Sequence, residues 1–339
     1  ADEAQPSFRL SFFRRLGFGV GDFGISIFWN TTNLFAMFFY TDVIGLSNIA
    51  SGTIIFGAML WDVIGRAPRR MAPGADVPGR IRHLPGGVAL NVAVALARRG
   101  LAPAVLSAVG RDPEGCALVA EAQRLGVLTG WLSRETGLPT DCYMGIEDSE
   151  GLIAAIADAH SLERAGGAIL APLSGDLAGW TAPVVLDGNL TEDLLSAIAR
   201  DPRLAGADLR IVPASPGKAE RLEPLIAARR GCFYLNRLEA EILAGRSCPD
   251  AAAAAEAVVA RGAARVLVTD GAHPAAEAMA NAPTLTCAPP HVTVARVTGA
   301  GDCFLAAHLA AELKAQPRGD ALRRAVEASA AHVSGRDVP

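Results

Sequence analysis

From Thr53 onward, short runs of strand character alternate with longer alanine-rich runs, and this alternation restricts the possible folds more than any other feature of the chain. The predicted strands are TIIFGA (53–58), APAVLSAV (102–109), PVVLDG (183–188), LRIVPA (209–214), CFYLN (232–236) and RVLVTD (265–270). The predicted helices cover 89–99, 114–125, 191–200, 217–229, 237–244, 250–262, 302–315 and 319–333. This order predicts βαβ units, and therefore an α/β fold with a doubly wound, mainly parallel sheet and helices on both faces.

One segment interrupts this alternation. Residues 143–158 have the pattern of a β-hairpin, YMGIED followed by LIAAIAD, that turns at Ser149-Glu150-Gly151. The stretch 66–84 is rich in Pro, Gly and Arg and is the expected partner flap. We therefore predict a small β lid, with elements near 66–84 and 140–160, on the α/β domain.

The start of the chain differs in composition from the rest. Of the 19 aromatic residues, 13 lie within residues 8–61, and no charged residue occurs within 23–41 or 43–61. Uncharged runs of this length are long enough to cross a bilayer. Arginines flank both ends of the region, so the positive-inside rule favours a hairpin or no insertion over a single span. We predict a hydrophobic segment at 1–52 and a separate α/β domain at 53–339; membrane association of the segment stays open.

Composition argues against several classes of protein. A net charge of −4 and a pI near 5.9 give no basis for binding nucleic acid. The six cysteines contain no CxxC pair, which argues against a zinc site or a disulfide framework and indicates a reducing, cytoplasmic location. GVGDFG (19–24) matches a dinucleotide-binding loop, but no strand precedes it, so we do not predict a dinucleotide site there.

The strongest motif is VTGAGD (297–302), which leads directly into a predicted helix. Small residues let the backbone approach an anion closely, and a helix N-terminus offers unpaired N–H groups and the positive end of the helix dipole. Asp302 follows at once, where a carboxylate beside a bound phosphate can accept a proton from a hydroxyl group. The alternative is an ordinary helix start with Asp302 as the N-cap residue.

A second element, PGGVALN (85–91), opens another alanine-rich helix. Gly86 and Gly87 allow a ligand to approach the backbone, and Asn91 lies one turn into the helix, where its amide can bind hydroxyl groups. The alternative is a turn followed by a helix whose Asn91 faces solvent.

A third element is Asn236 with Glu239, directly after the predicted strand 232–236. Residues three apart share a helix face, so this pair can organise Mg²⁺ and its water ligands. The alternative is an ordinary start of a surface helix. Gly217-Lys218 lacks the rest of a Walker A motif, so we predict no P-loop.

Together, in this order and spacing, the three elements resemble the ribokinase (PfkB) family of carbohydrate kinases. Asp62 and VGRDPEG (109–115) extend the resemblance, which covers residues 53–339. It implies a ribokinase-like fold with a β lid, a small-molecule substrate, ATP and Mg²⁺, and a homodimer formed through the lid.

The resemblance also implies a role for each matching residue. Asp302 would be the catalytic base, and Gly299, Ala300 and Gly301 would form the anion hole. Asp62, Gly86, Gly87 and Asn91 would hold the sugar. The residues for ATP and its Mg²⁺ would be Asn236, Thr269, Gly271 and, through water, Glu239.

Several shorter segments resemble pseudouridine kinases within that family: AIADAHSLE (155–163), VVLDGNL (184–190), PASPGKAERL (213–222) and NRLEAEIL (236–243). Pseudouridine carries an additional ring N–H beside its C–C glycosidic bond. Asp158 and Asn189 are the candidate acceptors for that group, since both follow predicted strands. Each would otherwise cap a local turn.

One position departs from the family pattern. Many members place an aspartate six residues before the catalytic one, where it helps to bind an activating monovalent cation, and Arg296 stands there in this chain. A guanidinium repels a cation, so we expect little activation by K⁺.

Residues 16–62 resemble the first transmembrane region of a glycoside-pentoside-hexuronide:cation symporter. One or two helices cannot form a transport pathway between repeats, so we expect no transport. A gene fusion or a misjoined reading frame explains the segment, with the junction within GAMLWDVIG (57–65).

The leading hypothesis is an ATP-dependent kinase of the primary hydroxyl of pseudouridine. Alternatives are another PfkB kinase, of the ribose, fructose or 2-keto-3-deoxygluconate type, and a catalytically silent sugar-binding protein of the same fold.

Overall fold

The computed structural model describes residues 52–72, 74–134, 137–149 and 151–336. The predicted hydrophobic segment and its GVGDFG match (19–24) therefore lie outside the described residues, apart from Gly52. Within the described part of the chain, no helix is both long enough and apolar enough to cross a membrane.

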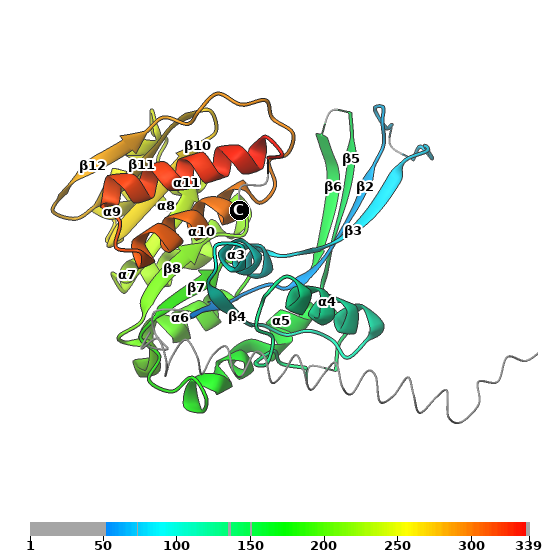
Figure 1. Ribbon diagram of the computed structural model, residues 1–339. Helices are drawn as coiled ribbons and strands as arrows, with labels where there is room; N and C mark the ends of the chain where they lie inside the picture. The colour runs from blue at the N-terminus through cyan, green and yellow to red at the C-terminus, as the bar shows by residue number, and fades with distance from the viewer. Residues whose placement is uncertain (1–51, 73, 135–136, 150, 337–339) are drawn as a thin grey trace, which may run out of the picture. The chain divides into compact units, whose positions relative to one another are not determined.

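An eight-stranded sheet forms the centre of the domain (Figure 1). Its strands in chain order are β1 (Gly52–Phe56), β4 (Ala102–Leu106), β7 (Pro183–Asp187), β8 (Asp208–Val212), β9 (Cys232–Asn236), β10 (Arg265–Asp270), β11 (His273–Met279) and β12 (Ala282–Cys287). Across the sheet the order is β12-β11-β10-β9-β8-β7-β1-β4, with six parallel strands and an antiparallel β11–β12 edge. The carboxyl ends of the parallel strands therefore meet along one edge, where ligands bind in such folds.

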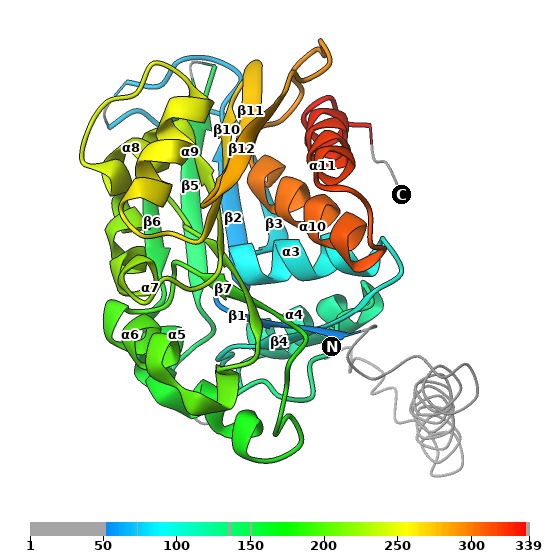
Figure 2. The ribbon, with the colours of Figure 1, turned by 90° about the vertical axis from the view of Figure 1, so that its left-hand side faces the viewer.

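Helices cover both faces of this sheet (Figure 2). One layer contains α3 (Val88–Ala97), α4 (Pro113–Arg124), α10 (Ala300–Leu313) and α11 (Arg318–Val333). The other contains α5 (His160–Ala165), η2 (Gly166–Ser174), α6 (Glu192–Arg200), η3 (Pro202–Leu204), η4 (Pro216–Leu222), α7 (Glu223–Ala227), α8 (Arg237–Ala244) and α9 (Ala251–Ala260). The predicted doubly wound α/β fold is confirmed.

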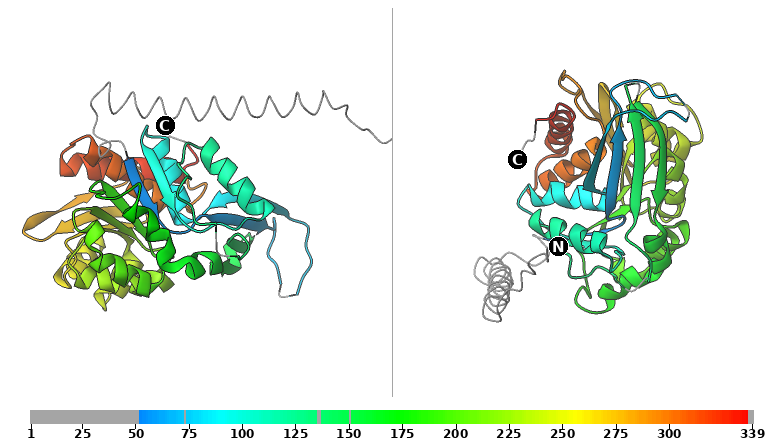
Figure 3. Two further views of the ribbon diagram at one scale, coloured as in Figure 1. Left: turned by 90° about the horizontal axis from the view of Figure 1, so that it is seen from below. Right: turned by 90° about the vertical axis from the view of Figure 1, so that its right-hand side faces the viewer.

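A separate four-stranded sheet forms the lid (Figures 1 and 3). Its strands are β2 (Leu60–Arg66), β3 (Arg80–Gly86), β5 (Cys142–Asp148) and β6 (Gly151–Asp158). The spatial order is β3-β2-β5-β6, and β2 pairs with β5 in parallel while the other pairs are antiparallel. The predicted hairpin at 143–158 is thus present, and the flap predicted at 66–84 is the connection between β2 and β3 together with most of β3.

The two faces of the lid differ in character. The register places Asp62, Leu84 and Tyr143 in one row, and these side chains line a cavity. The side chains of alternate rows point to the opposite face, and they include Ile81 and Ile156, which are 72% and 69% exposed. The lid therefore covers the cavity with one face and presents an apolar face on the other side.

Three features differ from the sequence-based expectation. The helix predicted at 217–229 is the 3₁₀ helix η4 followed by α7, because Pro224 cannot donate an N–H within a continuous helix and starts a new one. Strand β11 is alanine-rich, and β12 lacks the alternation of a half-buried strand. The sequence pattern therefore did not predict either strand. Asp62 was expected after the first strand and lies inside β2, because only three residues separate this first lid strand from β1.

Helix α10 is tied to the sheet by buried charges at its C-terminal half. Glu312 accepts a hydrogen bond from Arg265 Nη1 at 2.6 Å, and Arg210 also donates to it. His308 is fully buried, and burial lowers its pKa to about 3, so the imidazole is neutral in this cluster. Because α10 is rigid, these contacts also fix the position of its N-terminus.

Candidate active site

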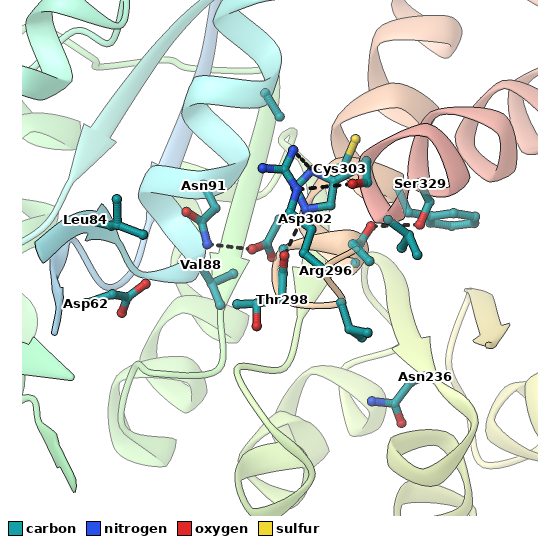
Figure 4. Close-up of a pocket in the computed structure, with 18 of the residues that line it drawn as sticks. Asp62, Leu84, Val88, Asn91, Asn236, Arg296, Thr298, Asp302, Cys303 and Ser329 are labelled. Carbon is teal, nitrogen blue, oxygen red and sulfur yellow. Dashed lines mark hydrogen bonds between the residues drawn. The ribbon is translucent and has the colours of Figure 1, made fainter. Parts of the chain in front are cut away.

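A large cavity lies between the inner face of the lid, α3, the carboxyl ends of the parallel strands and the N-terminus of α10 (Figure 4). Residues from all three predicted elements line it, although they are far apart in the sequence. The predicted site residues at its wall are Asp62, Gly87, Asn91, Asp158, Asn189, Asn236, Glu239, Thr269, Gly271, Gly299, Ala300, Gly301 and Asp302. Gly86 is the exception, since it packs behind Asp62.

The N-terminus of α10 is open toward this cavity. Gly299 is its N-cap residue, in the left-handed conformation (φ 82°), and no side chain caps the helix. The alternative in which Asp302 is the N-cap residue is therefore wrong. The first-turn N–H groups of a helix have no partner within it, although that of Ala300 donates to Val297 O at 3.1 Å. The N–H groups of Gly301 and Asp302 are thus the first-turn donors that remain available to a ligand in the cavity.

Asp302 lies in the first turn of α10 and is only 8% exposed. The side-chain amide of Asn91, from the facing helix α3, donates a hydrogen bond to Asp302 Oδ2 at 2.9 Å (Figure 4). Burial raises the pKa of Asp302 to about 7, and the carboxylates of Asp187, Asp62 and Glu239 add to the rise while the Asn91 bond opposes it. A carboxyl group of this kind takes up and returns a proton near neutral pH.

Asp62 faces the cavity from the lid strand β2 (Figure 4). A Cβ at Gly86 would come within 2.1 Å of Asp62 Oδ2, and a Cβ at Gly87 would come within 2.4 Å of the Ala58 carbonyl oxygen. Both glycines are therefore required by close packing, and Gly87 also has φ 88°. Burial raises the pKa of Asp62 to about 6.

A buried chain of polar groups that the sequence did not reveal ends at the cavity. The carboxylate of Asp187 is fully buried and accepts bonds from the Ala58 and Asn189 backbone N–H groups, both at 2.8 Å. The Asn189 amide donates to both Asp187 oxygens at 3.0 Å, and its Oδ1 accepts from Lys218 Nζ at 2.6 Å. Asn189 thus connects Asp187 to Lys218, which lines the cavity.

Lys218 belongs to the Gly-Lys pair that lacked the rest of a Walker A motif. In the sequence, the position of Lys218 shortly after β8, a strand of the parallel sheet, could have indicated that it belongs to the site; no motif did so. Burial lowers the pKa of Lys218.

Asn236 and Glu239 form a capping box at the start of α8. Glu239 N donates to Asn236 Oδ1 at 2.9 Å, and Asn236 N donates to Glu239 Oε2 at 2.8 Å. This fulfils the alternative of an ordinary helix start, yet both residues also line the cavity. Burial raises the pKa of Glu239 to about 7. Thr269 and Gly271 lie at the end of β10 and just beyond it, on the same edge of the sheet.

The described residues contain no cluster of three or more His, Cys, Asp or Glu side chains arranged to hold a metal ion. Mg²⁺ in phosphoryl transfer is commonly held by one or two carboxylates plus substrate phosphates. Glu239 at the cavity wall fits that mode, so the residues present are compatible with Mg²⁺ that arrives with a nucleotide.

Asp158 lies at the end of β6 and pairs with His160. Its Oδ1 is 2.6 Å from His160 Nδ1, and this bond lowers the pKa of Asp158 and raises that of His160. Asp158 also lines the cavity, so one of its oxygens is engaged locally at the edge of the site.

Comparison with known proteins confirms both resemblances seen in the sequence. The profile of the pfkB family carbohydrate kinases matches residues 52–338, and that of MFS/sugar transport proteins matches residues 17–65. The two matches overlap at 52–65, which includes the predicted junction 57–65.

Individual relatives agree with the family match. Pseudouridine kinase of Escherichia coli is 27% identical over 274 residues, which are 80% of this chain and 86% of that protein. The structure of a carbohydrate kinase from Agrobacterium tumefaciens has a TM-score of 0.71 at 25% identity, covering 85% of this chain and 94% of that one. Arabidopsis thaliana ribokinase, solved with ribose and ATP, has a TM-score of 0.67 at 20% identity, covering 84% and 92%.

Proposed function

Because the chain belongs to the pfkB family of carbohydrate kinases, which transfer a phosphoryl group from ATP to a hydroxyl group, we propose that it phosphorylates the primary 5′-hydroxyl of pseudouridine or a closely related nucleoside. One observation carries the catalytic part of this proposal. The buried carboxyl group of Asp302 lies at the open N-terminus of α10, held by Asn91 from the opposite wall of the cavity.

In the proposed reaction the hydroxyl oxygen of the acceptor attacks the γ-phosphorus of ATP. The bond from that phosphorus to the β–γ bridging oxygen breaks, and ADP leaves with the bond's electron pair. Asp302 takes the hydroxyl proton, which suits a carboxyl group with a pKa of about 7. The Gly299–Gly301 turn and the N–H groups of Gly301 and Asp302 stabilise the charge on the transferred group.

For the donor, we assign ATP to the edge of the sheet beyond β9 and β10. Asn236, Thr269 and Gly271 would contact the nucleotide, and Glu239 would hold waters of the Mg²⁺ ion. The ion, when bound with ATP, neutralises charge on the phosphates. ATP as the donor also supports a cytoplasmic location.

For the acceptor, Asp62, Gly87 and Asn91 would hold the ribose. Gly86 leaves the room that the Asp62 side chain needs. Two observations support a nucleoside: the pseudouridine kinase of E. coli is similar along most of its length, and Lys218 lines the same cavity as the residues assigned to the sugar. The ammonium group of Lys218, oriented by Asn189, is suited to a carbonyl oxygen of the base.

This arrangement changes the role expected for Asn189. Its amide oxygen already accepts from Lys218, and its amide nitrogen donates to Asp187. Asn189 would therefore orient Lys218 rather than read the base itself. Asp158, with one oxygen bonded to His160, is the remaining candidate acceptor for the additional N–H of pseudouridine.

We also propose that two copies of the chain associate through the outer face of the lid. Val63, Met144 and Ile156 form one cross-strand row on that face, and Ile81 and Ile146 form the next, around Gly65. Met144 and Ile146 are 46% and 40% exposed, and Ile81 and Ile156 more so. Burying this apolar face against a second copy would stabilise the lid over both cavities.

The test is a measurement of ADP formation with pseudouridine, uridine, adenosine, ribose and fructose. We expect kcat/KM for pseudouridine to exceed that for each of the others by at least about tenfold, or about 1.4 kcal/mol in the transition state, because uridine lacks the additional N–H that an acceptor at the edge of the site would bind. The Asp302→Asn variant serves as the inactive control. Equal or better use of a free sugar would contradict the pseudouridine assignment and leave a sugar kinase of the same family.

A further inference from the structure

The turn that opens α10 is bound to the last helical turn of α11. The backbone N–H groups of Ala295 and Arg296 both donate to the carbonyl oxygen of Val333, at 2.8 and 3.1 Å. Ser329 Oγ donates to the carbonyl oxygen of Ala300 at 3.1 Å. The irregular segment before the VTGAGD motif therefore runs along the carboxyl end of α11 before the chain enters α10.

Two side chains complete this attachment. Arg296 Nε donates to the carbonyl oxygen of His332 at 3.1 Å, and Arg296 Nη2 lies 3.3 Å from His332 Nδ1. The other ring nitrogen, His332 Nε2, lies 2.9 Å from the carbonyl oxygen of Thr298. The Thr298 carbonyl oxygen can only accept a hydrogen bond, so His332 Nε2 carries the proton. The Arg296 guanidinium can only donate, so His332 Nδ1 accepts from it. The hydrogen bonds thus run from Arg296 through His332 to Thr298.

His332 also fixes the shape of the turn itself. A Cβ at Gly299 would lie 3.2 Å from His332 Nε2, so the imidazole packs directly against the residue whose left-handed conformation (φ 82°) starts α10. The guanidinium of Arg296 lies at the negative end of the α11 dipole, where a positive charge is favourable. Figure 4 shows Arg296 and Thr298 beside Asp302, across it from Asn91.

We infer that Arg296 and His332 are positioning residues that hold the Gly299–Gly301 turn in the shape that binds the phosphates of the nucleotide. Arg296 supplies a permanent positive charge at the carboxyl end of α11 and orients His332. His332 in turn contacts the Thr298 carbonyl and Gly299. This inference rests on the proposed anion hole. It predicts that loss of either side chain weakens binding of the nucleotide and leaves binding of the acceptor almost unchanged.

The experiment measures binding of ADP and ATP by calorimetry, which needs no acceptor, together with KM for ATP and for the acceptor. Arg296→Ala is expected to raise Kd for nucleotide and KM for ATP by about tenfold, which corresponds to about 1.4 kcal/mol. Millimolar guanidinium should restore most of the affinity to Arg296→Ala by occupying the vacated place. Arg323→Ala, on the exposed surface of α11, is the matched control.

His332→Leu should reproduce the effect of Arg296→Ala, and the double variant should be no weaker than either single one, because the two side chains act in one series of contacts. Unchanged nucleotide affinity in Arg296→Ala, or a loss that guanidinium does not restore and that affects both substrates equally, would overturn the inference. If the wild-type protein binds no nucleotide at all, the anion-hole assignment itself fails and this inference fails with it.

Discussion

Replacing Asp302 by asparagine tests the proposed base most directly. The substitution keeps the size of the side chain and leaves one oxygen to accept the Asn91 amide, now 2.9 Å from Asp302 Oδ2. The variant cannot accept the hydroxyl proton, so turnover should fall by roughly 10²–10⁴, the usual contribution of general-base catalysis. Binding of ATP should change little, because the backbone N–H groups at the start of α10 remain.

The same substitution should stabilise the folded protein at alkaline pH. Burial raises the pKa of Asp302 from 3.8 to about 7, so the folded state binds its proton more tightly than the unfolded state does. The stability provided by that proton is complete below pH 3.8 and is lost as the pH rises through 7. The difference corresponds to about 4 kcal/mol, and Asp302→Asn should recover a large part of it at pH 8 but little at pH 4.

The assay is denaturant unfolding of both proteins at pH 4 and pH 8, beside steady-state ADP formation at pH 8. The expected result is an inactive variant that is more stable than the wild type only at the higher pH. A variant that keeps more than a tenth of the turnover would show that another group is the base. A variant that is less stable than the wild type at pH 8 would show that burial of the ionised Asp302 carboxylate does not destabilise the folded state.

Four further outcomes follow from the site and the sequence. The kcat/KM of the wild type should rise with pH and reach half its maximum near pH 7, where Asp302 becomes ionised; a flat profile between pH 5 and 9 would contradict this. Lys218→Met should lower kcat/KM for pseudouridine by about tenfold and for ribose hardly at all, as compared in parallel assays. Replacing K⁺ by a bulky organic cation at constant ionic strength should change the rate little, since Arg296 occupies the corresponding position, and strong activation by K⁺ would refute that expectation. Removing residues 1–52, which we propose are foreign to the kinase fold, should leave cooperative unfolding intact by circular dichroism.

The sequence by itself determined the class of fold and the main chemical groups of the site. Alternation of strand and helix patterns is a local property, so six parallel strands could be assigned before the structure was known. The VTGAGD motif (297–302) specifies a glycine turn, a helix start and a carboxylate within a few residues, so the proposed anion hole and base were recognisable in the chain. The change in composition after Trp61 likewise indicated two parts, and the two parts match different families.

Only the tertiary structure decided what depends on contacts between distant residues. The pKa of Asp302 comes from burial and from carboxylates on three other elements, none of which is near it in the sequence. The connection from Asp187 through Asn189 to Lys218 joins the ends of two strands, and no motif contains all three. Arg296 was recognisable only as a departure from a family pattern, while its partner His332 lies far along the chain, on α11. Hydrogen bonds and desolvation act over a few ångströms in space, and folding alone brings these groups within that distance.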